Sequence, residues 1–294
     1  MRVAELYRKA GKKPVVSFEF FRAKTEKGAV SLEKVLDALC AVRHDFMTVT
    51  FGAGGSTREG SYELIDKLKK DRGQDVVAYI AGVGLGPDDI IGVMDKFKSQ
   101  GIETVFVIAG DAPQDDLHFK PHPEAMAHAS DLLAFIRPRY DFCLGAAAYP
   151  EGHIHAVSLE KDIEYAKLKQ DNGAEYLVAQ YFYDNRFFYD YVDKCRAIGI
   201  TVPIIPGIMP IYSVKMTEML SAVCGTSIPA EVRKGMDAVS PDDKDGIVKF
   251  GIDLALRQCR DLVKHGVPGL HFYTMNRAAS VAPIVTALEK EGLI

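Results

Sequence analysis

Several features that would place the chain in a common functional class are missing from its 294 residues. No segment approaches the ~18 uninterrupted apolar residues of a membrane-spanning helix. Residues 1–14 form a short amphipathic stretch that lacks the apolar centre of a signal peptide. There is no block of basic residues, and 36 Lys and Arg against 40 Asp and Glu give a net charge of −4. We therefore expect a cytoplasmic protein that binds a small or polar organic ligand, with no nucleic acid and no membrane as partner.

The cysteines and histidines do not form a recognisable ligand set. The five cysteines are odd in number, and the two closest, Cys195 and Cys224, are 29 positions apart. Disulfide frameworks and zinc or iron–sulfur sites have other spacings. His118, His122 and His128 lack a carboxylate or cysteine that would complete a metal site. We expect no metal and interpret the cysteines as reduced, mostly packed thiols.

Two glycine-rich segments do not match a dinucleotide-binding fingerprint. GAGGST (52–57) and GVGLGP (82–87) end in Thr57 and Pro87, where G-x-G-x-x-G requires glycine. A separate nucleotide-binding fold is therefore not supported.

What the sequence does have is a series of apolar, β-branched runs between amphipathic helical segments, within a chain that is 48% hydrophobic. The eight runs are VVSFEFF from 15, FMTVTF from 46, VVAYIAG from 76, TVFVIAG from 104, FCLGAAAY from 142, YLVAQYF from 176, VPIIPGI from 202 and GLHFYT from 269. Their spacing of roughly 30 residues is the length of a βα unit. Eight such units in series predict an α/β fold, a (βα)8 TIM barrel.

The gap at 209–268 is longer than the others and is expected to hold additional helices between strands 7 and 8, including GIDLALRQCRDLVKHG. No linker or composition break divides the chain, so residues 1–294 are predicted to be a single barrel domain.

A barrel places its site where the C-terminal ends of the strands converge. Polar residues stand at or near five of the predicted ends: Glu19, Thr50, Asp111, Tyr149 and Gln180. Glu19 is unusual because it interrupts a run of strand formers, and burying it without a partner would cost several kcal/mol. In general such a residue is most often paired with Arg or Lys inside the barrel, and otherwise serves chemistry.

Seven motifs, in this order and spacing over nearly the whole chain, resemble the methylenetetrahydrofolate reductase family. They are SFEFFRAKTEKG, VTFGAGGSTREG, GD after the fourth strand, AAYPEGH, AQYFYD, PGIMPI and FYTMNR. The resemblance implies a flavin-dependent (βα)8 barrel that reduces 5,10-methylenetetrahydrofolate to 5-methyltetrahydrofolate.

The resemblance also implies roles for individual residues. Glu19 matches the acid that protonates N10, so that the substrate ring can open to an N5-iminium, and an apolar setting favours the protonated carboxyl. Asp111 matches a catalytic aspartate near flavin and pterin, although GDAP is also ordinary turn chemistry. Gln180, Tyr273 and Arg277 fall at folate-contacting positions, and a strand-end glutamine bonded to backbone is the alternative for Gln180.

The flavin-contacting positions are matched by a larger set of residues. Lys169 and His153 could face phosphate, Asp162 could bind ribose hydroxyls, and Tyr149 could cover the ring system. Asp162 and Lys169 could equally be solvated charges on a helix. The full set is Thr50, Tyr79, Gly110, Asp111, His128, Ala129, Ala148, Tyr149, His153, Asp162 and Lys169.

The chain departs from the family pattern mainly on the flavin side, for example at Arg22-Ala23-Lys24, Ala109, His128 and Leu168. We expect FAD as cofactor with FMN as an alternative, and NADH or NADPH as electron donor. A homo-oligomer or an iron–sulfur partner subunit is an expectation from the family alone. The main alternative is an accessory pterin- or flavin-binding subunit that is inactive by itself. A Schiff-base lyase is disfavoured because no strand run contains lysine.

Overall fold

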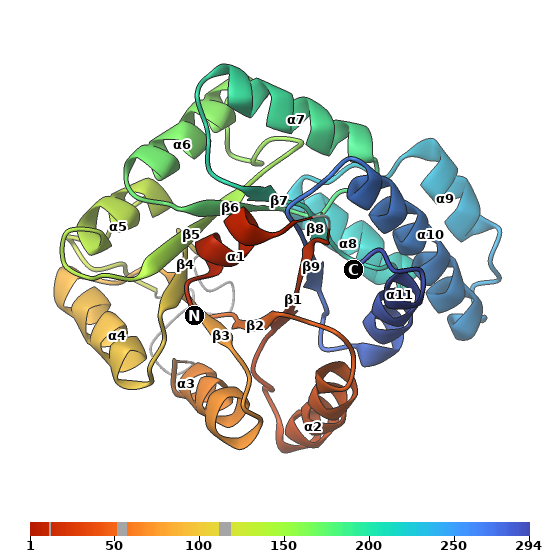
Figure 1. The fold of residues 1–294 in the computed structure, drawn as a ribbon, viewed down its shortest axis with the longest axis horizontal. Coiled ribbons are helices and arrows are strands. Elements are labelled where there is room, and N and C mark those ends of the chain that lie inside the picture. The colour runs from red at the N-terminus through yellow and green to blue at the C-terminus, as the bar shows by residue number, and fades with distance from the viewer. Residues whose placement is uncertain (12, 52–57, 112–118) are drawn as a thin grey trace.

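Parallel strands alternate with helices around a barrel in the computed structural model, which describes residues 1–11, 13–51, 58–111 and 119–294 (Figure 1). The predicted (βα)8 architecture is confirmed. The strands are β1 (Val15–Phe20), β2 (Phe46–Val49), β3 (Val76–Ala81), β4 (Thr104–Ile108), β5 (Cys143–Ala148), β6 (Tyr176–Ala179), β7 (Ile204–Ile205), β8 (Gly207–Ile208) and β9 (Gly269–Tyr273).

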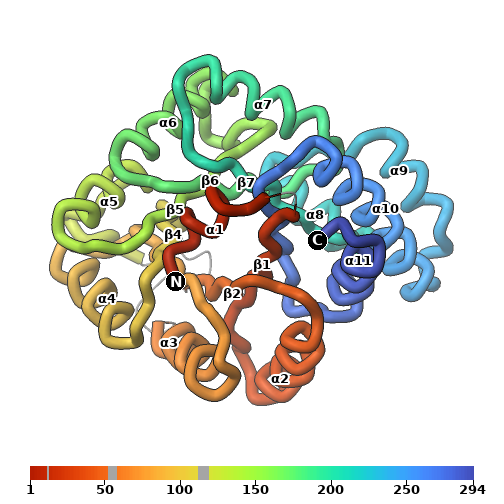
Figure 2. Tube along the Cα trace, viewed as in Figure 1, coloured from red at the N-terminus to blue at the C-terminus, as the bar shows by residue number. Residues whose placement is uncertain are grey.

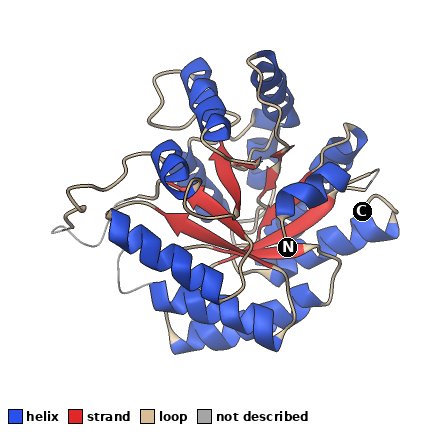
Figure 3. Cartoon of the chain, turned by 60° about the vertical axis from the view of Figure 1, so that its left-hand side comes forward, coloured by secondary structure: helices blue, strands red, loops and turns tan. Residues whose placement is uncertain are grey.

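The helices that follow the strands form an outer ring around them, while the first helix lies across one end of the barrel (Figure 3). They are α1 (Val3–Lys9), α2 (Glu26–Cys40), α3 (Arg58–Asp66) with a π-helical turn η2 (Lys67–Asp71), α4 (Pro87–Ser99), α5 (Ala129–Ile136), α6 (Leu159–Asp171), α7 (Asn185–Ala197), α8 (Val214–Cys224), α9 (Ala230–Asp237), α10 (Lys244–Lys264) and α11 (Ala278–Lys290). The long predicted gap holds α8, α9 and α10. None of the helices in the described ranges is long and apolar enough to cross a membrane.

The ring of strands closes through a single broken segment. The strand order is β7-β6-β5-β4-β3-β2-β1-β9-β8, and β7 and β8 are the two halves of the run that was predicted as one strand. Pro206 separates them because proline has no N–H to donate to a ladder. Its carbonyl still accepts from the His271 N–H at 3.1 Å. One half therefore pairs with β6 and the other with β9.

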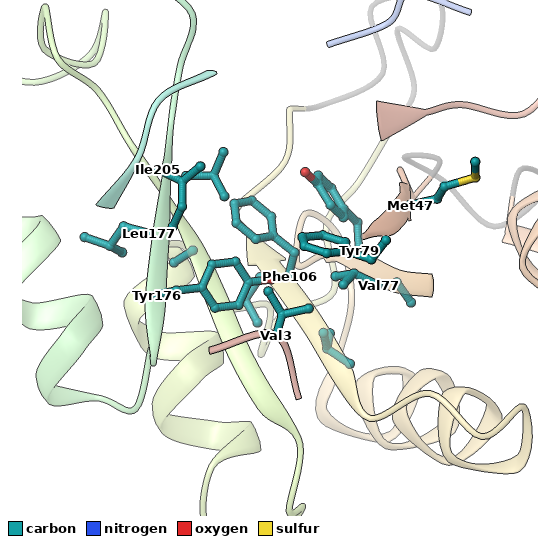
Figure 4. Packing of buried hydrophobic residues seen from close by; sticks show 14 of the residues in the cluster. Val3, Met47, Val77, Tyr79, Phe106, Tyr176, Leu177 and Ile205 are labelled. Carbon is teal, nitrogen blue, oxygen red and sulfur yellow. The ribbon is translucent and has the colours of Figure 1, made fainter. Parts of the chain in front are cut away.

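Aromatic side chains fill the barrel interior (Figure 4). The Tyr79 and Phe106 rings stack with centroids 4.6 Å apart, and Phe106 lies 6.0 Å from Tyr176. Gly145 makes room for the last of these, since a Cβ at this position would lie 2.2 Å from the Tyr176 ring.

Helix α1 closes the N-terminal end of the barrel (Figure 2). Its buried Tyr7 lies 5.6 Å from the Tyr176 ring and 6.2 Å from Phe46. The Val3 N–H donates to the Thr104 hydroxyl at the start of β4. Access to the interior must therefore come from the opposite, C-terminal end.

Candidate functional site

Glu19 lies in the next-to-last position of β1, paired with Thr48 of β2 and Tyr273 of β9. Its side chain is 16% exposed, so the carboxyl is largely inside the barrel but can be reached from the C-terminal end. The Thr274 hydroxyl donates to the Glu19 carbonyl at 2.5 Å. The backbone that carries this carboxyl is thus held from three sides.

The neighbours of the Glu19 carboxyl are aromatic and imidazole groups. His271 Nε2 lies 3.7 Å from Glu19 Oε2, a contact that is an ion pair only when the imidazole is protonated. Burial raises the pKa of Tyr79 and Tyr273 well above the ordinary value, and the nearby Glu19 charge raises both further. The Arg or Lys partner that a purely structural buried glutamate would need is not found within the described ranges.

A strained turn fixes the end of β1 against the end of β9. Met275 and Asn276 have φ of 49° and 51°, in the left-handed region that non-glycine residues rarely adopt. Asn276 Nδ2 donates to the Phe21 carbonyl at 2.7 Å, and its Oδ1 accepts from the Phe21 N–H at 3.3 Å. These bonds take the place of ladder hydrogen bonds just beyond Glu19, so they fix the position of the strand end that carries the carboxyl.

A second polar group lies beyond the ends of β4 and β5. Gly110 takes a positive φ of 78° and delivers the exposed Asp111. Burial raises the pKa of Tyr149, and the charges of Asp162 and Asp111 add to this rise, which places both carboxylates near the phenol. Burial lowers the pKa of His153, with His155 and Lys169 adding to the effect.

Two charged residues of this group are buried on the inner face of α6. Asp162 and Lys169 are 4% and 9% exposed, so neither is a solvated charge on the helix exterior. Lys169 Nζ donates to the Ala147 carbonyl at 2.8 Å and lies 5.2 Å from the Tyr149 ring centre. Asp162 Oδ2 is buried and finds no hydrogen-bond partner among the described residues. Such an oxygen is suited to accept a hydroxyl from a bound ligand.

Burial raises the pKa of Asp162 to about 6, while the Lys169 charge opposes the rise. Because the Asp162 carboxyl binds its proton more tightly in the folded than in the unfolded state, it favours the fold below pH 3.8. This contribution is lost as the pH rises through about 6. Asp162→Asn should therefore leave the free energy of unfolding of the ligand-free protein unchanged near pH 4. At pH 7 the substitution should raise the free energy of unfolding by up to about 3 kcal/mol. Urea unfolding at both pH values tests this, with exposed Asp171→Asn as control; equal effects at both would contradict it.

The remaining predicted residues lie around the same end of the barrel. Gln180 Oε1 accepts from the Tyr181 N–H at 3.0 Å, the backbone-bonded arrangement considered as its alternative. His128 is the exposed N-cap residue of α5, and the buried Ala129 begins the helix. Thr50 is half-buried just after β2, and Ala148 ends β5. His118 and the GAGGST segment, residues 52–57, lie outside the described residues.

Arg277 lines a cavity of about 670 Å³ beside the ends of β1 and β9. Its guanidinium lies 4.3 Å from the Tyr212 ring centre. Arg22, Lys24 and Lys34 also line this cavity, and its lining includes no acidic residue from the part of the chain that is described.

Sequence reasoning did not identify His271, Thr274 or Asn276. A signal existed for His271, because it is a polar residue inside an apolar run, two positions before Tyr273 and on the same strand face. Thr274 and Asn276 carry no such signal, since their effect depends on where β1 ends. No cluster of His, Cys, Asp and Glu suited to a metal ion occurs in the described ranges.

Comparison with known proteins gives independent information about the family of this chain. The family described as methylenetetrahydrofolate reductase matches residues 5–289. A maize methylenetetrahydrofolate reductase (NADH) is 34% identical over 95% of this chain and 48% of its own length. The chain spans about half the length of the plant and fission yeast relatives that it matches. The 5,10-methylenetetrahydrofolate reductase of Escherichia coli is 31% identical over 90% of this chain and 86% of its own length.

Solved structures agree on the fold. A Clostridium thermocellum protein that binds two copies of 5-methyl-5,6,7,8-tetrahydrofolic acid superposes with a TM-score of 0.69 at 15% identity, over 99% of this chain and 100% of that one. An Aquifex aeolicus structure gives a TM-score of 0.54 at 13% identity, over 99% of this chain and 97% of that one. Given the family match over most of its length, the chain belongs to the methylenetetrahydrofolate reductase family.

Proposed function

We propose that this protein reduces 5,10-methylenetetrahydrofolate to 5-methyltetrahydrofolate, with Glu19 as the acid that protonates N10. The observation that carries the proposal is the setting of Glu19: a largely buried carboxyl at the C-terminal end of the barrel, near two tyrosines and a histidine. A carboxyl at this position can reach a ligand bound at the C-terminal end and act as a general acid toward it. Family membership supplies the substrate.

Protonation at N10 is the step that this chain's own residues perform. N10 leaves the bridging carbon with the electron pair of the C–N bond and takes the proton from Glu19, and the bridging carbon becomes an N5-iminium. Glu19 is left as a carboxylate. Because general acids contribute about 10²–10⁴-fold to such steps, a group held in register by Thr274 and the Asn276 turn is well suited to this role.

Other groups around the C-terminal end of the barrel can orient the substrate. Asp111 can accept paired N–H bonds from the 2-amino-pyrimidinone edge of a pterin. The Gln180 amide can donate to the same ligand while its oxygen stays on the Tyr181 N–H. Arg277 and its cationic neighbours in the 670 Å³ cavity suit the carboxylates at the far end of a folate.

The residues at the ends of β4 and β5 fit a flavin nucleotide. The unpartnered Asp162 oxygen can accept a ribose or ribityl hydroxyl, Lys169 and His153 can face phosphate, and Tyr149 can cover a ring. Thr50, Tyr79, Gly110, His128, Ala129 and Ala148 are proposed to complete the binding surface. The flavin, FAD in this proposal, would supply the hydride for the iminium carbon. NADH is the proposed source of electrons, since the maize relative carries it in its name.

The test is spectroscopic. Purified protein incubated with FAD or FMN should turn yellow, bleach on addition of NADH, and regain its colour when methylenetetrahydrofolate is added. Mass analysis of the released flavin identifies the cofactor, and NADPH in a parallel experiment identifies the donor. A correctly folded protein that stays colourless with both flavins would contradict the proposal. Bleaching without recovery by the folate would instead favour an accessory subunit.

A further inference from the structure

His271 is a buried histidine for which the proposed reaction has so far assigned no role. It lies in β9 and is 1% exposed. Its neighbour across the β1–β9 ladder is Ser17, and the Tyr273 ring stands edge-on to the imidazole at 5.0 Å. A titratable side chain that is removed from water in this way needs partners on both nitrogens.

One nitrogen has such a partner. His271 Nδ1 lies 2.8 Å from the Ser17 hydroxyl oxygen, and both residues are fully buried. The other nitrogen, Nε2, has no hydrogen-bond partner among the described residues, and the group it faces is Glu19 Oε2 at 3.7 Å. At this separation the imidazole and the carboxyl are just beyond hydrogen-bond distance of each other.

We propose that His271 and Glu19 share one proton, and that His271 is the group that keeps this proton available to Glu19 at neutral pH. The inference rests on the proposed function, because it assigns a source for the proton that Glu19 gives to N10. His271 touches neither substrate nor flavin in this scheme, so it is a positioning and proton-holding residue.

The exchange is balanced by a single proton. In one form the imidazolium donates Nδ1–H to Ser17 and Nε2–H to the Glu19 carboxylate. In the other form the proton has moved from Nε2 to the carboxyl oxygen, and the neutral imidazole accepts from Glu19 through its Nε2 lone pair while Nδ1–H stays on Ser17. The bond to Ser17 therefore keeps His271 Nδ1 protonated in both forms, and Nε2 is the nitrogen that exchanges its proton.

Titratable groups face the pair from several of the elements packed against it. Tyr79 of β3 and Tyr273 of β9 lie near Glu19, and burial followed by the Glu19 charge raises the pKa of both, so they stay neutral. Behind Ser17, burial raises the pKa of Tyr7, and Asp45 adds to this rise. In the described part of the barrel no permanent cation competes with His271 for Glu19.

The test is the pH dependence of folate reduction by the prereduced holoenzyme, measured in single turnover, for wild type and His271→Gln. Without the imidazole, Glu19 must take its proton from solvent, which supplies protons more readily at low pH. We expect His271→Gln to lose a larger share of the wild-type rate at pH 7.5 than at pH 5. A purely structural role would give an equal loss at both, which would overturn the inference.

Two controls separate this inference from the proposed function. His44→Gln removes a half-buried histidine that is bonded to Gln74 and the Val42 carbonyl, and should leave the pH profile unchanged. If Glu19→Gln does not impair folate reduction, the proposed acid is wrong. If it does, and His271→Gln keeps the wild-type pH profile, only the shared proton is wrong.

A measurement on the wild-type protein covers the case in which His271→Gln does not fold. Nitrogen-15 NMR of histidine-labelled protein should show one imidazole whose Nδ1 stays protonated at all pH values while Nε2 changes protonation. Ser17→Ala should shift that signal and no other, since it removes the acceptor of Nδ1–H. An Nδ1 that is unprotonated in wild type would overturn the inference.

Discussion

Glu19→Gln is expected to lower the rate of methylenetetrahydrofolate reduction by about 10²–10⁴-fold, the contribution usual for a general acid, while reduction of the flavin by NADH stays within a few-fold of wild type. Glutamine keeps the shape and the backbone contacts of Glu19 but has no acidic proton to give to N10. The two half-reactions can be followed separately by flavin absorbance in a stopped-flow instrument.

The control for this experiment is Glu26→Gln, which removes a carboxylate from the exposed first turn of α2 and should affect neither half-reaction. Equal losses in both half-reactions of Glu19→Gln would show that Glu19 supports the site as a whole and is not its acid. Retention of both would exclude it from the chemistry.

The second large effect concerns packing. Gly251 lies in α10 where the helix crosses the chain after β8, and a Cβ at this position would sit 1.8 Å from the Ile211 carbonyl oxygen. Since the obstacle is backbone, it cannot rotate away, and Gly251→Ala should lower the free energy of unfolding by about 3 kcal/mol, the upper end of usual overpacking costs.

Gly92 offers a matched comparison, because it is also a helical glycine but has nothing within 4 Å of its added Cβ. Gly92→Ala should raise the free energy of unfolding by about 0.5–1 kcal/mol through helix propensity alone. Urea unfolding of both variants measures the difference. A destabilised Gly92→Ala, or a Gly251→Ala as stable as wild type, would contradict this description of the packing.

The fold could be predicted from sequence because barrel strands are buried on both faces and therefore appear as continuous apolar runs. All eight runs coincide with strands, and most of them continue one to three residues past the observed strand end. The run from 202 was predicted as one strand, and Pro206 divides it into β7 and β8. The segment 61–71 is amphipathic and helical, but nothing in its residue pattern indicates the π-helical turn from Lys67.

The site was harder to predict because its residues act across strands that are distant in sequence. Asp162 and Lys169 lie on the inward stripe of α6 together with Ala166, at i, i+4 and i+7, and a stripe that contains two charges does not read as a buried face. Their burial depends on the shape of the β5–α6 region, which residue types alone do not define. His271 could have been noticed by the reasoning applied to Glu19, since both interrupt apolar strand runs.

The break at Pro206 has a mechanical consequence for the C-terminal end of the barrel. The two strands on either side of it have only two residues each, so few ladder hydrogen bonds close the ring of strands there. The Tyr273 hydroxyl adds a bond across this region by donating to the Ala179 carbonyl of β6 at 3.0 Å. Gln180, the next residue, lies at the same place. A ligand that displaces the phenol would break this bond, so closure of the strand ring at this point is linked to occupancy of the C-terminal end of the barrel.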